Sequence, residues 1–222
     1  MKVLHLSFSL LNGGKENLLV DIAIEQQKLG NTVGILIVNE VYEASILNRI
    51  PETIRLFLLK RKTGIKGFLS LPELFRIMLL DFKPDIIHAH DASFGKMFKF
   101  FIKPLVVLTV HGPGISISDM KHFDKLFAIS NAVRKDVENR GGLHCKVVYN
   151  GIRTSGITRK TYYPDSGKIR LVHVKRLNHE RKGKDLLIRA IGSILEHKRT
   201  DLELHLVGDG PSRPFLETMV KE

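Results

Sequence analysis

Residues 171–211, LVHVKRLNHERKGKDLLIRAIGSILEHKRTDLELHLVGDGP, predict a strand, a cationic loop, a helix, a second strand and a glycine turn, in that order. The apolar run over 169–174 is typical of a buried strand, and 202–207 repeats it before Gly208-Asp209-Gly210. The segment between them has apolar residues at the spacing of one helix face: Leu186, Leu187, Ala190, Ile191, Ile194 and Leu195. This alternation predicts two parallel strands joined by a crossover helix.

The loop of this unit carries a cluster of cations around Gly183: Lys175, Arg176, Arg181, Lys182 and Lys184. A helix N-terminus presents free backbone N–H groups and a partial positive charge, and Arg and Lys side chains add full charges to it. The pattern therefore indicates an anion site. A solvated surface turn is the alternative that the loop alone leaves open.

Here the sequence resembles a known family. The segments VKRLNHERKGKDLLIRAI and LELHLVGDGP resemble the start of the donor-binding domain of family 4 glycosyltransferases, which have the two-domain GT-B fold. The resemblance implies that Arg176, Lys182 and Gly183 hold the diphosphate of a nucleotide sugar. One residue more than in the commonest family pattern separates the Arg from the Lys, which leaves open whether Arg181 or Lys182 reaches the phosphate.

The composition is that of a globular protein with a strong positive charge. The 222 residues are 43% hydrophobic and carry a formal net charge of +12, and no long uncharged apolar run predicts a transmembrane helix. The single cysteine, Cys145, favours a reducing cytoplasm. The charge would attract an anionic membrane, nucleic acid or phosphorylated substrates. We expect no nucleic acid, because no zinc-ligand spacing, recognition helix or RNP-like motif is present.

The remaining chain alternates strands and helices, which predicts an α/β fold. Expected strands cover 2–8, 33–38, 54–59, 85–88, 105–109, 125–129 and 146–149, and expected helices cover 15–29, 71–82, 92–101 and 131–139. We predict a GT-B type arrangement: an N-terminal acceptor-binding Rossmann-like domain with a doubly wound parallel sheet (1–152), a linker (153–168), and an incomplete second Rossmann-like domain for the nucleotide sugar (169–222). In such sheets ligands bind at the carboxyl ends of the strands.

Two loops at expected strand ends carry candidate site residues. Gly13 and Gly14 precede the first helix, where the resemblance places them near the donor; an ordinary strand-to-helix turn is the alternative. His88 and His90 alternate along one strand, so that they share a side, and could be metal ligands, acid/base groups or part of a capped turn. The resemblance places His90 at the reacting sugar carbon as the catalytic candidate and Asp91 on the acceptor side.

Three further segments match family landmarks. His111, in Thr109-Val-His111, would line the acceptor side of the cleft, although an exposed histidine in a turn explains it equally well. Gly208 and Gly210 would contact the donor. Ser130 or Asn131 is a natural N-cap for the helix that follows.

Two basic apolar stretches, 57–78 and 95–103, suggest contact with an anionic membrane surface. A helix covering the sheet, with lysines on its wet side, is the other interpretation. Because acceptors in such enzymes are often lipid-linked, we expect the protein in the cytoplasm, peripheral on the inner membrane face.

The resemblance implies a glycosyltransferase that moves a sugar from a UDP- or GDP-sugar to a lipid-linked or polysaccharide acceptor, without a metal or cofactor. Residue 222 follows the second strand of the donor domain, so we expect a C-terminally truncated chain that is inactive by itself. A non-catalytic protein that binds the acceptor or a membrane is the alternative. A dinucleotide-dependent oxidoreductase is disfavoured, because the first turn lacks the G-x-G-x-x-G pattern.

Overall fold

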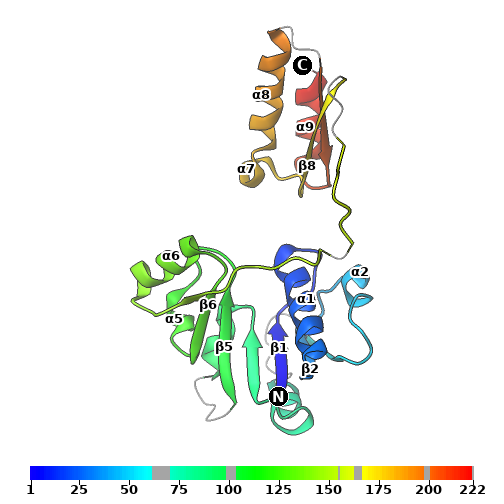
Figure 1. Cartoon of the computed structure of the whole chain (residues 1–222). Helices are drawn as coiled ribbons and strands as arrows, with labels where there is room; N and C mark the ends of the chain where they lie inside the picture. The colour runs from blue at the N-terminus through cyan, green and yellow to red at the C-terminus, as the bar shows by residue number, and fades with distance from the viewer. Residues whose placement is uncertain (62–70, 99–103, 155, 163–166, 198–200, 222) are drawn as a thin grey trace. The chain divides into compact units, whose positions relative to one another are not determined.

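The computed structural model describes the chain except residues 62–70, 99–103, 155, 163–166, 198–200 and 222. The chain divides into two compact units, Met1–Gly156 and Ile157–Glu222. In Figure 1 the first unit runs from blue to yellow-green and the second from yellow to red.

The first unit is built on a parallel sheet with strand order β3-β2-β1-β4-β5-β6-β7. Its strands are β1 (Lys2–Ser7), β2 (Thr32–Asn39), β3 (Arg55–Arg61), β4 (Ile86–Ala89), β5 (Leu105–Val110), β6 (Lys125–Ala128) and β7 (Lys146–Val147). The order runs outward from β1 in one direction and from β4 in the other. The point between these two strands is therefore the place where a doubly wound sheet opens a crevice for a ligand.

Helices cover both faces of this sheet. They are α1 (Gly14–Lys28), α2 (Ala44–Leu47), α3 (Leu71–Arg76), the π-helical turn η2 (Ile77–Asp81), the 3-10 turn η3 (Ala92–Phe94), α4 (Gly95–Phe98), α5 (Ile117–Met120) and α6 (Asn131–Gly141). Ser130 caps α6, because its Oγ accepts the backbone N–H of Val133 at 3.2 Å. Gly142 ends the same helix with φ 62°, a left-handed conformation that suits glycine.

The period of two along the strands divides the core into two clusters. Leu4 and Leu6 of β1 pack in the larger cluster, which also holds Phe94 and Met78. The opposite face packs against α1 through Leu19 and its neighbours. His5 lies between Leu4 and Leu6 in sequence, so its side chain points to the face that α1 covers.

The second unit holds the strand–loop–helix–strand pattern that the sequence predicts. β8 (Ile169–Val174) and β9 (Leu202–Val207) pair in parallel, and α8 (Lys184–Glu196) connects them. Two elements were not expected. The loop contains one helical turn, α7 (His179–Lys182), whose charged residues show no apolar period, and α9 (Arg213–Lys221) follows the glycine turn. The apolar residues Phe215, Leu216, Met219 and Val220, spaced as on one helix face, were the available signal for α9.

Several predicted boundaries differ from the structure. The expected helix over 71–82 is α3 followed by η2, and the one expected over 92–101 begins as η3 and α4, with 99–101 outside the described residues. The expected strand over 146–149 is β7, shorter by two residues. The two basic apolar stretches fall partly on 62–70 and 99–103, which also lie outside the described residues.

Candidate functional site

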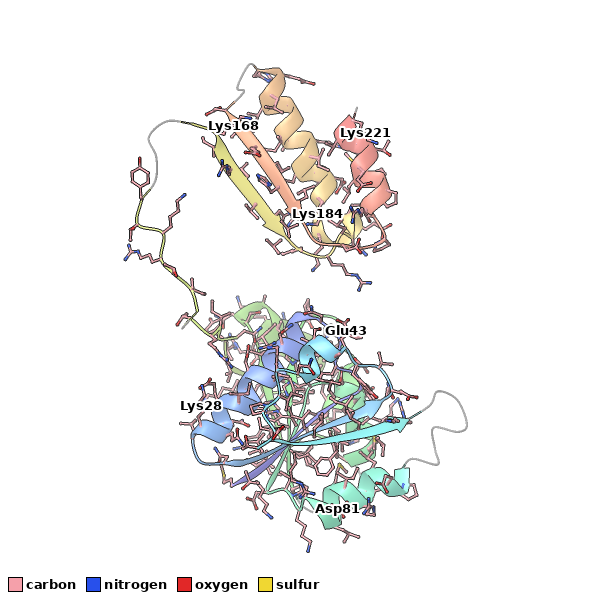
Figure 2. The ribbon with its side chains drawn as sticks, turned by 90° about the vertical axis from the view of Figure 1, so that its right-hand side faces the viewer. Lys28, Glu43, Asp81, Lys168, Lys184 and Lys221 are labelled. Atoms are coloured by element: carbon pink, nitrogen blue, oxygen red, sulfur yellow. The ribbon has the colours of Figure 1, made fainter. Side chains whose placement is uncertain are left out.

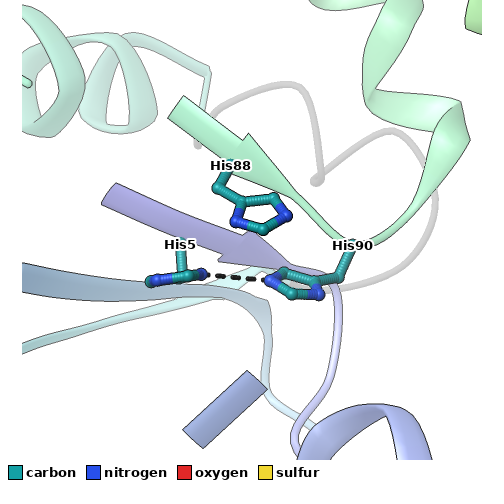
Figure 3. A group of neighbouring side chains, drawn as sticks. All are labelled: His5, His88 and His90. Carbon is teal, nitrogen blue, oxygen red and sulfur yellow. Dashed lines mark hydrogen bonds between the residues drawn. The ribbon is translucent and has the colours of Figure 1, made fainter. Parts of the chain in front are cut away.

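The site of the first unit lies where β1, β4 and β5 end. His5 of β1 and His88 of β4 are register partners, and His90 follows on the same side of the sheet. Their rings lie close together: the centroids are 5.0 Å apart for His5 and His88 and 4.5 Å apart for His88 and His90. Figure 3 shows the three imidazoles gathered beside the strand ends. The parallel register therefore assembles a histidine cluster from residues far apart in sequence.

A continuous chain of hydrogen bonds runs through this cluster. Gln26 Oε1 of α1 lies 2.8 Å from His5 Nε2, and His5 Nδ1 lies 3.1 Å from His90 Nε2. His90 Nδ1 lies 3.1 Å from His111 Nε2, just beyond β5. His88 stands beside this chain with its Nε2 2.7 Å from Thr109 Oγ1.

The direction of the chain follows from its first member. Gln26 Oε1 can only accept, so His5 Nε2 carries its proton and His5 Nδ1 accepts from His90 Nε2. His90 Nδ1 then accepts from His111 Nε2–H. The half-buried His111 is left with Nδ1 as an acceptor. Gln26 thus sets the tautomers of three histidines in series.

Burial keeps these rings neutral. It lowers the pKa of His5 to about 4, against a weaker opposing effect of the Gln26 hydrogen bond. Burial also lowers the pKa of His111 to about 4, and the charge of Lys15 adds to the effect while Asp91 opposes it. The pKa values of His88 and His90 are lowered mainly by burial, and further by the neighbouring histidines. The cluster therefore offers uncharged imidazole nitrogens at neutral pH.

Asp91 ties the end of β4 to the end of β1 and to the glycine turn. One carboxylate oxygen accepts from Ser7 Oγ at 3.0 Å and from the backbone N–H of Phe8 at 3.1 Å. The other accepts from Lys15 Nζ at 2.7 Å, and 23% of the Asp91 side chain stays exposed. Gly13 and Gly14 directly precede Lys15, so this ion pair places the glycine turn beside the histidines.

The second unit presents the cationic loop and the glycine turn as one structure. Leu177 N–H donates to the Asp209 carbonyl at 2.9 Å, and Ser212 N–H donates to the Leu177 carbonyl at 3.0 Å. Arg176 and Lys182 are exposed, on the loop and at the end of α7. Gly183 precedes α8 with φ 60°. Both candidate cations are therefore exposed on the segment that leads into α8.

Gly208 and Gly210 have a packing reason that the sequence did not reveal. A Cβ on Gly208 would lie 2.2 Å from the Lys175 carbonyl oxygen, and one on Gly210 would lie 2.5 Å from the Leu177 carbonyl oxygen. Both also have positive φ, 141° and 157°. The two glycines let the turn approach the cationic loop, so they position Arg176 whatever else they contact.

The structure thus brings the candidate residues together in two groups. Gly13, Gly14, His90, Asp91 and His111 gather in the first unit, and Arg176, Lys182, Gly208 and Gly210 gather in the second.

Sequence reasoning missed His5, Gln26 and Lys15. A lone polar residue inside the apolar strand KVLHLS was the signal for His5. Gln26 and Lys15 gave no signal, because polar residues are ordinary on a helix.

Several solved structures share this architecture, and they include a UDP-GlcNAc 2-epimerase as well as glycosyltransferases. The chain matches Anabaena Alr3699/HepE in complex with UDP and glucose at TM-score 0.74 and 19% identity, covering 100% of this chain and 65% of that one. It matches the apo form of the lipopolysaccharide outer core galactosyltransferase WaaB at TM-score 0.66 and 19% identity, with 100% and 64% covered. WaaG, a glycosyltransferase involved in lipopolysaccharide biosynthesis, matches at TM-score 0.67 and 14% identity, with 99% and 66% covered.

These likenesses define the fold as α/β of the GT-B type, as the sequence predicts. The chain spans about 65% of the length of the first of these structures. No curated protein sequence matches it. The model of Glycosyltransferase Family 4 matches residues 12–155, more than half of the chain. The chain therefore belongs to glycosyltransferase family 4, which confirms the resemblance seen in the sequence.

Proposed function

We propose that this chain supplies the acceptor-binding domain, residues 1–152, and the opening of the donor-binding domain, 169–222, of a glycosyltransferase. A linker over 153–168 joins them. The parent enzyme transfers a sugar from a UDP- or GDP-sugar to a lipid-linked or polysaccharide acceptor in cell-surface glycan synthesis. It works in the cytoplasm, peripheral on the inner membrane face.

One observation carries this proposal: Arg176 and Lys182 are exposed on the segment that leads into α8, and Lys182 stands two residues before the first residue of that helix. Hydrogen bonds between the loop and the Gly208–Ser212 turn hold the backbone around Arg176 in place. A leaving nucleoside diphosphate carries negative charge that must be neutralised as the glycosidic bond breaks. Two exposed cations and the dipole of α8 would supply that neutralisation, so we expect the transfer to need no metal or cofactor.

His90 and Asp91 act on the acceptor side in this proposal. The His90 ring is 3% exposed with both nitrogens bonded, so it reaches a reacting sugar through its backbone or through His111. Asp91 holds Lys15 and the glycine turn in place and keeps part of its carboxylate accessible to an acceptor hydroxyl. Gly14 leaves room for the donor, because no atom lies within 4 Å of where its Cβ would be. A Cβ on Gly13 would lie 2.5 Å from Glu16 Oε2, so we propose that Gly13 contributes through its backbone.

Calorimetric titration of the chain with UDP and with GDP tests the donor site. We expect one nucleotide to bind and Arg176→Ala to weaken binding about tenfold or more, because a hydrogen bond to a charged group contributes about 1.5–3 kcal/mol. Arg189→Ala is the matched control, since Arg189 is an exposed arginine further along α8. Equal affinity in wild type and the Arg176 variant would remove the diphosphate role.

The extent of the family match favours a second candidate. The matched residues, 12–155, lie within the first unit, which has a full sheet and core of its own. If only the first unit is functional, the chain would bind an acceptor or an anionic membrane without catalysing sugar transfer. Binding of acceptor lipid or anionic vesicles at low salt, with no nucleotide binding and no turnover, would favour this candidate. Turnover with a nucleotide sugar by the 222-residue chain would exclude it and would also overturn our expectation that the chain alone is inactive.

A further inference from the structure

The three buried histidines of the first unit have the geometry of a ligand set. One ring nitrogen from each of His5, His88 and His90 lies within 4.8 Å of the others. His5 and His88 are register partners on adjacent strands, and His90 directly follows β4. The side chains of His5 and His90 are 0% and 3% exposed. Such a set needs no loop movement to form.

Each imidazole also has its other nitrogen held by a partner outside the set. Gln26 Oε1 holds Nε2 of His5 at 2.8 Å, and Thr109 Oγ1 holds Nε2 of His88 at 2.7 Å. His111 holds Nδ1 of His90 at 3.1 Å. The nitrogens left for a common centre are Nδ1 of His5, Nδ1 of His88 and Nε2 of His90. Metal-binding histidines typically have this arrangement, in which an outer partner fixes the ring orientation.

The distances fit a transition-metal ion. Zn–N bonds of 2.0–2.1 Å in a tetrahedron place two ligand nitrogens about 3.3 Å apart. His5 Nδ1 and His90 Nε2 are already 3.1 Å apart. One nitrogen of each ring lies within 4.8 Å of the other two, so a tilt of the His88 ring that brings its nitrogen about 1.5 Å closer or less completes the set. Three imidazoles suit zinc, copper or nickel, whereas magnesium and calcium prefer oxygen.

We propose that His5, His88 and His90 form a binding site for a zinc-class divalent ion, with a fourth position open to water or a ligand. The site goes beyond the proposed transferase function and shares His90 with it, but metal binding does not require that function. It is also distinct from the diphosphate site of the second unit.

Loading the ion would reverse a hydrogen bond. His90 Nε2 donates its proton to His5 in the structure, so this proton must leave before Nε2 can bind the metal. A proton added at His90 Nδ1 restores the neutral ring, and Nδ1 then donates to His111 Nε2. His111 in turn loses its Nε2 proton and gains one at Nδ1. Two protons leave, two are added, and the outward nitrogen of His111 changes from an acceptor to a donor.

Titration of the whole chain with Zn²⁺, after dialysis against a chelator, tests the site. We expect one tight equivalent by calorimetry, a higher Tm of the first unit, and visible absorption of a low-coordinate ion when Co²⁺ replaces Zn²⁺. His88→Asn should abolish these signals. His144→Asn is the control, because His144 is exposed and outside the cluster. Gln26→Leu should weaken binding 10–100-fold, the usual effect of losing an outer partner of a ligand.

Nitrogen-15 NMR of the histidine rings supplies a readout that does not depend on folding of a ligand variant. The metal-free chain should show His111 protonated at Nε2, and the loaded chain should show it protonated at Nδ1. Zn²⁺ binding that survives unchanged in both His88→Asn and Gln26→Leu would overturn the proposal, because surface histidines would then hold the ion. Absence of binding by the wild-type chain would overturn it as well.

Discussion

The two units of this chain build the same parallel strand–helix–strand arrangement but bury it to different degrees. Leu4 and Leu36, on neighbouring strands of the first unit, are 0% exposed. In the second unit Val172 and Val174 of β8 are 62% and 66% exposed, and Val207 of β9 is 48% exposed. The strands of both units have apolar sequences, so the sequence of a strand does not decide how deeply it is buried. The number of neighbouring strands and covering helices does.

The arrangement of the second unit explains this exposure. The register places Ile169, Leu171 and Leu204 on the sheet face beside α8, and Val172, Val174 and Val207 on the opposite face. A groove of about 820 Å³ remains between α8, β9 and α9 even on the covered face. Figure 2 shows Lys184 near the start of α8, and this side chain is fully buried where it meets the His173 carbonyl at 3.5 Å. Two strands rarely suffice for independent stability in water.

Amide hydrogen exchange should expose the largest difference. Amides of β1 and β5 are expected to exchange only when the first unit unfolds globally, whereas those of β8 and β9 exchange through local opening. We expect protection at least about a hundredfold higher in the first pair of strands. Comparable protection in the two units would mean that the exposed valines are covered in solution and that the contrast is wrong.

A matched pair of leucine substitutions sharpens the comparison. Leu36→Ala removes a fully buried side chain and should lower the free energy of unfolding of the first unit by about 2–5 kcal/mol. Leu171, 37% exposed on β8, should leave that transition unchanged when it is replaced by Ala. Urea unfolding followed by far-UV circular dichroism is suitable, since the chain has no tryptophan. An equal shift of the midpoint in both variants contradicts independent units.

Alanine substitutions at two glycines should have the next largest effects on the free energy of unfolding, with opposite signs. A Cβ on Gly95 of α4 would lie 1.9 Å from the Asp119 carbonyl oxygen, so Gly95→Ala forces the backbone apart and should cost about 1–3 kcal/mol. Gly192 in α8 has no atom within 4 Å of the built Cβ. Gly192→Ala should therefore stabilise the second unit by about 0.8–1 kcal/mol through helix propensity. Thermal unfolding of both variants measures the two signs, and a stabilising Gly95→Ala would show that α4 packs less closely than the structure has it.

Much of the fold was predictable because its signals are local. Apolar runs of five or six residues, separated by helices with one apolar face, specify a parallel α/β sheet without any long-range information. Ser130 was predictable as a helix cap, and the structure confirms it. The cationic loop before α8 was equally visible. The turn α7 was not, because HERK has no apolar period.

The histidine cluster shows where such reasoning ends. His88 and His90 attract attention together because they alternate along one strand. His5 joins them only because β1 pairs with β4 in a register that sets His5 beside His88, more than 80 residues away. Gln26 joins only because the α1 helix crosses that face. The pairing of the strands and the orientation of the α1 helix depend on packing between residues far apart in sequence. The histidine tautomers that Gln26 sets could therefore not be predicted from local sequence patterns.

Alanine substitutions at two serines should have the smallest effects on stability, again with opposite signs. Ser130→Ala removes the oxygen that accepts the Val133 N–H at the start of α6, so it should destabilise the first unit by about 1 kcal/mol. Ser193 is exposed in the interior of α8, where alanine has the higher helix propensity, so Ser193→Ala should stabilise slightly, by a few tenths of a kcal/mol. Chemical denaturation of both variants, monitored at residues of each unit by NMR, separates the two results. If Ser130→Ala left the stability of the first unit unchanged, water would be accepting the Val133 N–H at the start of α6. The Ser130 cap would then add nothing to the stability of that unit.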